Sequence, residues 1–376
     1  MKRLPILLLP LLLTACFGWF GSADEGVKPA ALTEFKPSAT PVVLWQAGAG
    51  SAGNYALQPM VEHSGIYAAG ADGAIARFDA ETGKQVWRTD TGKKISGGVG
   101  TGMGLVLAGT LKGEVLALDT NGNAKWQAEV SSEVLSAPQA ADGIVVVRCA
   151  DGRIFGLDAA DGKRKWIYQR ALPALALRSF AGTVVMRGAV FAGFAGGKLV
   201  ALNLANGNVG WEATVALPRG TNELERIADV TSMPVVDERQ ICAVAYQGRV
   251  ACFDVRNGNP IWARDVSSSA GLAIDQRNVY VSDEKGSVLA LDKTTGASVW
   301  KQDKLAARHL TAPLVRGNNI AVADFQGYVH LLSREDGSFA ARLATDGSAA
   351  RTQPVALNDG LLLQTANGGL FAISIK

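Results

Sequence analysis

The sequence is poor in the side chains that most enzymes use for acid–base and metal chemistry. It holds three histidines and four cysteines in 376 residues. His63, His309 and His330 lie far apart and form no H-x-x-x-H spacing that would place two imidazoles on one metal ion. The stretch "GFAGG" around Gly193 lacks the serine of a nucleophile elbow. We therefore predict no catalytic residue and no metal site.

An excess of one charge is also missing. The 37 basic and 34 acidic residues leave a net charge of +3, which excludes the strongly basic surface of a nucleic-acid-binding protein. Beyond residue 16 the apolar runs have the length of strands, so we expect no transmembrane helix. The stretch "GAGSAG" at 48–53 matches G-x-G-x-x-G, but no helical pattern follows it, and we predict no dinucleotide or other cofactor.

What the sequence has in abundance is glycine, in a repeated pattern. The stretch "ADGAIARFDAETGKQVW" at 71–87 returns as "LKGEVLALDTNGNAKW" at 111–126, "ADGRIFGLDAADGKRKW" at 150–166 and "EKGSVLALDKTTGASVW" at 284–300. A repeat of about forty residues is typical of propellers and solenoids. With 48% apolar residues, the chain can fill a large core.

Each repeat divides into four short strands. Residues 312–343 show this division, with apolar runs at 312–315, 320–323, 328–332 and 339–343 separated by Gly, Asn or Asp. These are the residues that make tight hairpin turns. No helical stripe appears in 42–376, and four antiparallel strands in about forty residues describe one blade of a β-propeller.

The recurring residues are of the kind that builds a scaffold. The turn glycines are Gly73, Gly113, Gly152, Gly197, Gly248, Gly286, Gly327 and Gly368, and the tryptophans on the fourth strand are Trp87, Trp126, Trp166, Trp211, Trp262 and Trp300. The tryptophan rings can lie between neighbouring sheets, and an aspartate six residues after most of the glycines can accept amide hydrogens in a turn. The seventh repeat has Ala341 and Ser333 in these places, so we expect looser packing there.

The eight glycines predict eight blades, but the last repeat stops after its third strand. A strand that resembles the missing one, "PVVLWQAG", lies at the other end of the chain and carries Trp45. We therefore predict an all-β domain over residues 42–376. It is an eight-bladed β-propeller of four-stranded antiparallel blades, closed by the N-terminal strand, which completes the last blade and removes an exposed edge.

The first residues have the pattern of an export signal. Residues 1–15 combine Lys2 and Arg3 with an apolar stretch, and "LTAC" resembles the lipobox at which a cysteine is lipidated. We expect lipid on Cys16, a flexible tether over residues 16–41, and a lipid anchor on the periplasmic face of the outer membrane, because Phe17 rather than Asp follows the cysteine. A secreted protein without lipid is the alternative.

A secreted protein can form disulfides. Cys242 and Cys252 lie on either side of a turn and could face each other across a hairpin, although two small buried thiols are the simpler interpretation and the one we favour. Cys149 has no obvious partner.

Two insertions interrupt the repeat, at 167–180 and at 212–234. Function on a repetitive scaffold usually lies in such departures, because loops vary without disturbing the core. The first insertion holds Leu175, Leu177 and Arg178, and the second combines apolar and charged residues around Asp229. A short helix over 223–228 is possible.

The lipobox, the eight tryptophan-containing repeats, "PALALRS" and "NELERIADVTSMP" together resemble the BamB family of outer-membrane protein assembly lipoproteins. The resemblance implies a non-enzymatic scaffold that docks on the periplasmic POTRA domains of BamA and assists the folding and insertion of outer-membrane proteins, with nascent barrel strands as a further possible partner. By position, it assigns partner binding to Leu175, Leu177, Arg178 and Asp229. The family has a second acidic residue two positions after the first, where this chain has Thr231.

Other interpretations remain open at this point. The repeat also resembles that of periplasmic alcohol dehydrogenases that use pyrroloquinoline quinone, a calcium ion and an aspartate base, although this chain lacks their adjacent cysteines. A propeller that binds another envelope partner is a third possibility. Within the first insertion, Leu175 and Leu177 could simply pack the loop on the ring, with Arg178 paired to Asp229.

Overall fold

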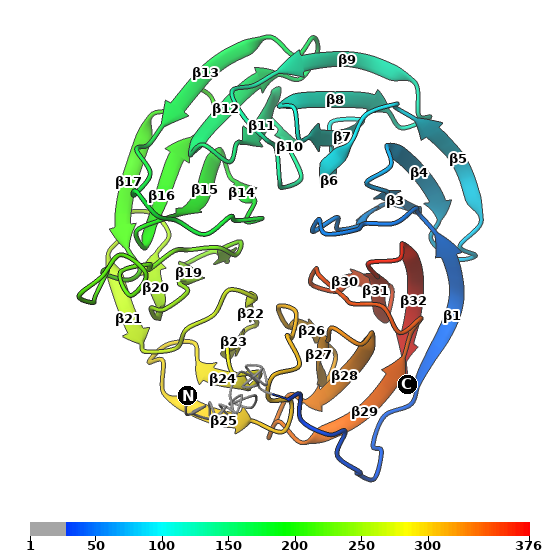
Figure 1. Cartoon of the computed structure of the whole chain (residues 1–376), viewed down its shortest axis with the longest axis vertical. Helices are drawn as coiled ribbons and strands as arrows, with labels where there is room; N and C mark the ends of the chain where they lie inside the picture. The colour runs from blue at the N-terminus through cyan, green and yellow to red at the C-terminus, as the bar shows by residue number, and fades with distance from the viewer. Residues whose placement is uncertain (1–27) are drawn as a thin grey trace, which may run out of the picture.

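A computed structural model describes residues 28–376, and these form a ring of eight four-stranded antiparallel sheets (Figure 1). The first four blades are β2 (Met60–Glu62), β3 (Gly65–Ala69), β4 (Ala74–Asp79) and β5 (Gln85–Asp90); β6 (Ile95–Gly102), β7 (Leu105–Thr110), β8 (Glu114–Asp119) and β9 (Ala124–Glu129); β10 (Gln139–Ala141), β11 (Ile144–Arg148), β12 (Arg153–Asp158) and β13 (Arg164–Gln169); and β14 (Thr183–Met186), β15 (Ala189–Phe194), β16 (Lys198–Asn203) and β17 (Val209–Thr214).

The other four blades continue the ring in chain order. They are β18 (Val235–Val236), β19 (Gln240–Val244), β20 (Val250–Asp254) and β21 (Pro260–Arg264); β22 (Gly271–Ile274), β23 (Asn278–Ser282), β24 (Val288–Asp292) and β25 (Ser298–Gln302); β26 (Leu314–Arg316), β27 (Asn319–Ala323), β28 (Tyr328–Ser333) and β29 (Phe339–Ala344); and β30 (Val355–Leu357), β31 (Gly360–Gln364), β32 (Gly369–Ile375) and β1 (Pro41–Gly48). The part of the chain that the structure describes has no helix able to cross a membrane.

The ring is closed by the N-terminal strand, as the sequence predicts. β1 pairs antiparallel with β32, from Pro41 opposite Ile375 to Gly48 opposite Gly369. The first and last strands of the domain therefore lie in one sheet, and Figure 1 shows β1 in blue beside β32 in red. Closure of this kind covers the edge that β32 would otherwise expose and gives the last blade four strands like the other seven.

Tryptophans join seven of the eight blades to the next blade. In each case the indole Nε1 donates a hydrogen bond of 2.8–3.1 Å to a carbonyl in the turn between the third and fourth strands of the following blade. The pairs are Trp45–Ala80, Trp87–Thr120, Trp126–Ala159, Trp166–Leu204, Trp211–Val255, Trp262–Lys293 and Trp300–Arg334. Each ring also covers a glycine of that turn, which is a second recurring glycine about ten residues after the one that marks each repeat. These glycines are Gly83, Gly122, Gly162, Gly207, Gly258, Gly296 and Gly337.

The repeated aspartate shapes the same turn. Asp79 Oδ1 accepts hydrogen bonds from the amides of Glu81 and Thr82 and from the Thr82 hydroxyl, at 3.2, 2.8 and 2.7 Å. The Thr82 hydroxyl and amide bonds, together with that of Glu81, hold the pKa of Asp79 below its usual range. The carboxylate thus holds the carbonyl of Ala80 where Trp45 reaches it, which is an architectural role.

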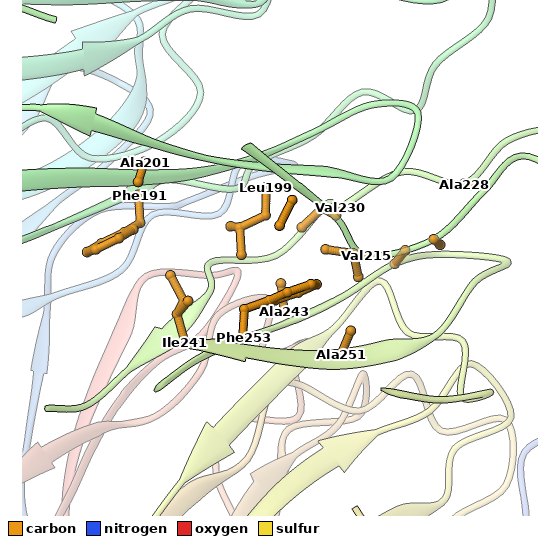
Figure 2. Packing of buried hydrophobic residues seen from close by; sticks show 13 residues of the cluster. Phe191, Leu199, Ala201, Val215, Ala228, Val230, Ile241, Ala243, Ala251 and Phe253 are labelled. Atoms are coloured by element: carbon orange, nitrogen blue, oxygen red, sulfur yellow. The ribbon is translucent and has the colours of Figure 1, made fainter. Parts of the chain in front are cut away.

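The core is divided among eight apolar clusters, one at each junction between blades. Figure 2 shows the cluster between the fourth and fifth blades, where Phe191 and Leu199 face Ile241 and Phe253. Strands two and three of each blade are buried on both faces, because each sheet lies between two others.

The seventh blade lacks a tryptophan because the eighth has no turn to receive one. The third and fourth strands of the eighth blade, β32 and β1, are the two ends of the domain, so no chain connects them. Residues just before β1 occupy the place instead: the amides of Ser38 and Ala39 donate to the Ala340 carbonyl. Ala341 is only 2% exposed, so the looser packing that we expected is not observed.

Residues 28–40 lie along the ring rather than hanging free, although we expected a tether as far as residue 41. This segment is the dark blue stretch beside β29 at the foot of Figure 1. Phe35 stacks on Phe339, with ring centroids 5.3 Å apart. The guanidinium groups of Arg308 and Arg342 donate to the carbonyls of Ala30 and Thr33, at 3.0 and 3.1 Å. The expected signal peptide, Cys16 and the rest of the tether lie outside the described residues.

The two arginines belong to a buried polar cluster on the seventh blade. Arg308 Nε donates to Asp324 Oδ2 at 2.6 Å, His330 Nε2 lies 2.9 Å from the same oxygen, and Arg342 Nε lies 3.3 Å from His330 Nδ1. Burial lowers the pKa of His330, although Asp324 opposes this effect. The arrangement therefore favours a neutral imidazole that donates to the carboxylate and accepts from Arg342.

Cys242 and Cys252 form a disulfide across the β19–β20 hairpin, so the two separate thiols that we favoured are wrong. The residues lie directly opposite each other in the register, a relation that the turn position alone did not establish. Cys149 is free and buried, and burial raises the pKa of its thiol to about 11.

Candidate partner-docking site

Both insertions lie on one face of the ring. The first connects β13 to β14 and the second connects β17 to β18, so each runs from the outer strand of one blade to the inner strand of the next. The equivalent connections of other blades surround an axial cavity of about 750 Å³, which Leu177, Arg178 and Thr231 also line. The insertions therefore stand at the rim of the central opening.

Asp229 joins the two insertions. Its carboxylate accepts hydrogen bonds from the amide of Leu177 at 2.7 Å and from the amide of Gly196 at 2.9 Å. The side chain is only 2% exposed, because Ala228 and Val230 on either side are anchored in the core between the fourth and fifth blades (Figure 2). Both oxygens are used within the chain, so Asp229 sets the position of the first insertion.

Arg178 does not pair with Asp229, and that internal pairing is wrong. Its Nη2 lies 3.0 Å from Glu133 Oε2, in the connection between the second and third blades. Both side chains are more than a third exposed, so water screens this ion pair and it contributes little to stability. Arg178 can therefore exchange Glu133 for a carboxylate of another protein at small cost.

Apolar side chains on the insertions face solvent. Leu172 and Leu175 of the first insertion are 40% and 39% exposed, and Leu217 and Leu224 of the second are 64% and 67% exposed. Leu177 is half-buried. Four exposed leucines on two adjoining loops, next to an exposed arginine, have the composition of a protein interface.

The second insertion is held by turns instead of the short helix that seemed possible. Glu225 accepts hydrogen bonds from the amide and the hydroxyl of Thr221, at 2.8 and 3.0 Å, and its own amide donates to Asn222 Oδ1 at 2.9 Å. These side chains offer the backbone an alternative to helical hydrogen bonds. The result is a compact loop from which Leu224 projects.

Thr231, which stands in the place of a second acidic residue, also helps to join the insertions. Its carbonyl accepts a hydrogen bond of 3.3 Å from the Ser179 hydroxyl, while its own Oγ1 is buried without a partner among the described residues. At the junction between the two insertions, the second insertion therefore supplies one carboxylate, that of Asp229.

Nothing in the described part of the chain groups three His, Cys, Asp or Glu side chains in a way that would hold a metal ion. Sequence reasoning missed Glu133 and Gly196, which contact the site from 45 and 33 residues away. It also missed Arg148, which lines a pocket with Leu177 and Asp229. No local pattern links these residues to the insertions, so only the folded ring brings them together.

Comparison with known proteins identifies close relatives. Residues 71–302 match the family described as outer membrane protein assembly factor BamB. Proteins of that name from Nitrosomonas eutropha and Bordetella pertussis are 48% and 44% identical to this chain, over 89% and 96% of it and 82% and 94% of the relatives.

Solved structures show the same fold. The crystal structure of BamB from Moraxella catarrhalis superposes with a TM-score of 0.83 at 29% identity, covering 89% of this chain and all of that one. A quinohemoprotein alcohol dehydrogenase from Comamonas testosteroni superposes with a TM-score of 0.73 at 13% identity, over 89% of this chain and 76% of its own. The second likeness shows a shared propeller and no more.

Proposed function

The chain belongs to the BamB family of outer membrane protein assembly factors, and on this premise we propose that it is a non-enzymatic scaffold that docks on the periplasmic POTRA domains of BamA. In this role it would assist the folding and insertion of outer-membrane proteins. The docking surface consists of Leu172, Leu175, Leu177 and Arg178 of the first insertion with Leu217 and Leu224 of the second.

One observation carries this proposal: the first insertion is exposed, yet it is hydrogen-bonded to the second insertion. Asp229 binds its backbone at Leu177, and Thr231 binds its side chain at Ser179, while Leu175 and Arg178 project into solvent. A loop that is ordered before binding loses little conformational entropy on docking. Leucines beside an arginine also give the apolar anchors and charged hydrogen bonds found at interface hot spots.

The axial cavity supports a role other than quinone-dependent oxidation. Oxidation of an alcohol by the quinone needs a carboxylate base and oxygen ligands for calcium at the cofactor. No Asp or Glu is among the residues that line this cavity, whereas Arg178, His309 and Arg351 are. The residues present therefore do not fit a calcium–quinone pair, and we derive no reaction for this cavity.

Attachment to the membrane completes the proposed function. We propose that Cys16 carries lipid and holds the protein on the periplasmic face of the outer membrane. Ala30 is bound to Ala306 and Arg308 in the connection between the sixth and seventh blades, on the face that carries the insertions. At most about 12 residues then separate the lipid from the ring, which limits the distance between them to roughly 40 Å. The docking surface would stay within that distance plus the width of the ring.

Arg178→Glu tests the docking surface. We expect the variant to lose the co-purification of BamA from detergent-solubilised outer membranes, because the new carboxylate repels acidic partner groups and Glu133. The melting temperature should stay within about 2 °C of the native value, because an exposed ion pair contributes only about 0–1 kcal/mol.

Arg187→Glu is the matched control. Arg187 also forms an exposed ion pair, with Glu238 at 3.1 Å, but it lies outside both insertions. It should leave BamA recovery unchanged. Equal recovery of BamA with Arg178→Glu and with Arg187→Glu would contradict the proposed docking surface.

A further inference from the structure

A small pocket lies beneath the first insertion. Its volume is about 210 Å³, and it opens between the loop carrying Leu172, Leu177 and Arg178, the end of β11 at Arg148, and Thr231 of the second insertion. The space is smaller than the cavities that usually enclose a drug-sized ligand. It is large enough for one side chain that enters from outside.

Arg148 is an unpaired cation at this pocket. Its guanidinium lies over the ring of Phe194, with Cζ 5.1 Å from the centroid. Within residues 28–376, its buried Nη1 finds no hydrogen-bond acceptor. Burial lowers the pKa of Arg148 to about 10, so the group is still charged at neutral pH. A buried donor without an acceptor destabilises the free protein, and a charged donor does so more.

A second arginine beside the Phe194 side chain shows the kind of partner that Arg148 has not found, a carboxylate. The Cζ of Arg170 lies 5.9 Å from the Phe194 centroid, but its guanidinium also binds the Glu212 carboxylate through two hydrogen bonds of 2.5 and 3.3 Å. Among the described residues that line the pocket the one acid is Asp229, and neither it nor Glu133 beside Arg178 is free. Asp229 accepts two backbone amides and Glu133 pairs with Arg178.

A second buried polar atom lines the same pocket without a partner. The Oγ1 of Thr231 can donate one hydrogen bond, and Arg148 Nη1 can donate two. Together they offer three donor hydrogens beside Leu172 and Leu177, and the threonine hydroxyl is the one of the two groups that can also accept. This chemistry suits a carboxylate on a short aliphatic stem, which is the side chain of Asp or Glu.

We propose that this pocket receives an acidic side chain of the protein that docks on the two insertions, with Arg148 and Thr231 as its hydrogen-bond donors. The inference rests on the proposed docking function and assigns the partner a carboxylate that no residue between 28 and 376 supplies. A charge-assisted hydrogen bond in a site closed by leucines is stronger than one at a wet surface, and arginine is enriched at such anchor points.

The test is the affinity of the full-length lipoprotein in detergent for the periplasmic domain of BamA, measured by isothermal titration calorimetry. Arg148→Met keeps the aliphatic length over Phe194 and removes the charge, and we expect it to weaken binding at least 20-fold. Thr231→Val should weaken binding about threefold. Arg170→Met is the control, because it alters an arginine on the same ring that already has its carboxylate; its affinity should stay within threefold of the native value.

Partner variants locate the carboxylate. Each Asp or Glu on the docking segment of BamA is changed to its amide and titrated against both the native protein and Arg148→Met. When the acid that enters the pocket is changed to its amide, the BamA variant should bind the native protein more weakly. The same BamA variant should bind Arg148→Met almost as well as native BamA does, since the two changes remove one interaction.

The outcomes separate this inference from the proposed function. If the affinity of Arg148→Met for BamA stays within threefold of the native affinity, the proposed role of the pocket is wrong, but the docking surface is not contradicted. Absence of native binding would overturn the docking function and the pocket with it. Equal losses for Arg148→Met and Arg170→Met would show that packing on Phe194 matters instead of the carboxylate, and would also overturn the inference.

Discussion

Gly83 is the position at which the closing strand meets the first blade, and Gly83→Ala should open the ring. The residue has φ of +68° and lies under the indole of Trp45. A Cβ at this position would approach Cδ2 and Cε3 of Trp45 at 2.5 Å, closer than van der Waals contact allows. The tryptophan of β1 would therefore have to lift away from the turn.

The expected loss of stability follows from two contributions. Alanine in the left-handed region costs about 1–2 kcal/mol, offset by about 0.4–1 kcal/mol from the stiffer unfolded chain. Burial of an indole is worth roughly 4–6 kcal/mol gross at about 25 cal/mol/Å² over about 150–250 Å². Loss of half of this burial and of the hydrogen bond to Ala80, about 1 kcal/mol, gives about 3–4 kcal/mol from displacement of the ring.

Gly92→Ala separates the two contributions. Gly92 has φ of +65°, but a Cβ there would meet nothing within 4 Å, so the variant bears only the backbone cost of about 1 kcal/mol. Urea unfolding followed by circular dichroism should show Gly83→Ala less stable than Gly92→Ala by about 3 kcal/mol. Gly83→Ala should also make residues 28–48 sensitive to protease. Equal unfolding free energies for the two variants would refute the role assigned to Trp45.

Two further predictions concern buried groups. When the protein is unfolded without reduction and treated with an alkylating reagent, Cys149 should react and Cys242 and Cys252 should not, as measured by peptide mass. Labelling of all three cysteines would disprove the disulfide. The folded-state pKa of His330 lies below its unfolded value, so stability should be complete above about pH 6.5 and fall as the pH drops below it, by up to about 1.4 kcal/mol per unit. His330→Gln should flatten that fall in urea unfolding between about pH 6.5 and 5.5, and parallel curves for the two proteins would rule out a neutral His330.

The blade architecture was predictable because each blade is specified locally. The alternating apolar residues of 114–119 and the turn residues that follow form β8 and its hairpin without help from distant parts of the chain. The position of Trp45 predicted the closing strand, because the residues that join blades recur in every repeat. In a regular repeat, the contacts between neighbouring blades can therefore be predicted from the residues that recur.

The departures from the repeat were harder to predict. Thr231 and Ala341 stood out as exceptions, but the reason for Ala341 lies in the absence of a β32–β1 turn in the folded ring. The path of residues 28–40 depends on Phe339, Arg308 and Arg342, which are about 280 to 310 residues away. No local pattern marks such a contact.

By itself the sequence determined the class of the protein: an eight-bladed ring closed by its own first strand, with two insertions that resemble those of its family. Only the tertiary structure decided how the insertions work. It buried Asp229 as the support of the first insertion, paired Arg178 with Glu133, and left Arg148 Nη1 beneath the loop without an acceptor among residues 28–376. The physical reason is that hydrogen bonding and ion pairing depend on distances of about 3 Å between residues that the chain brings together only when the ring closes.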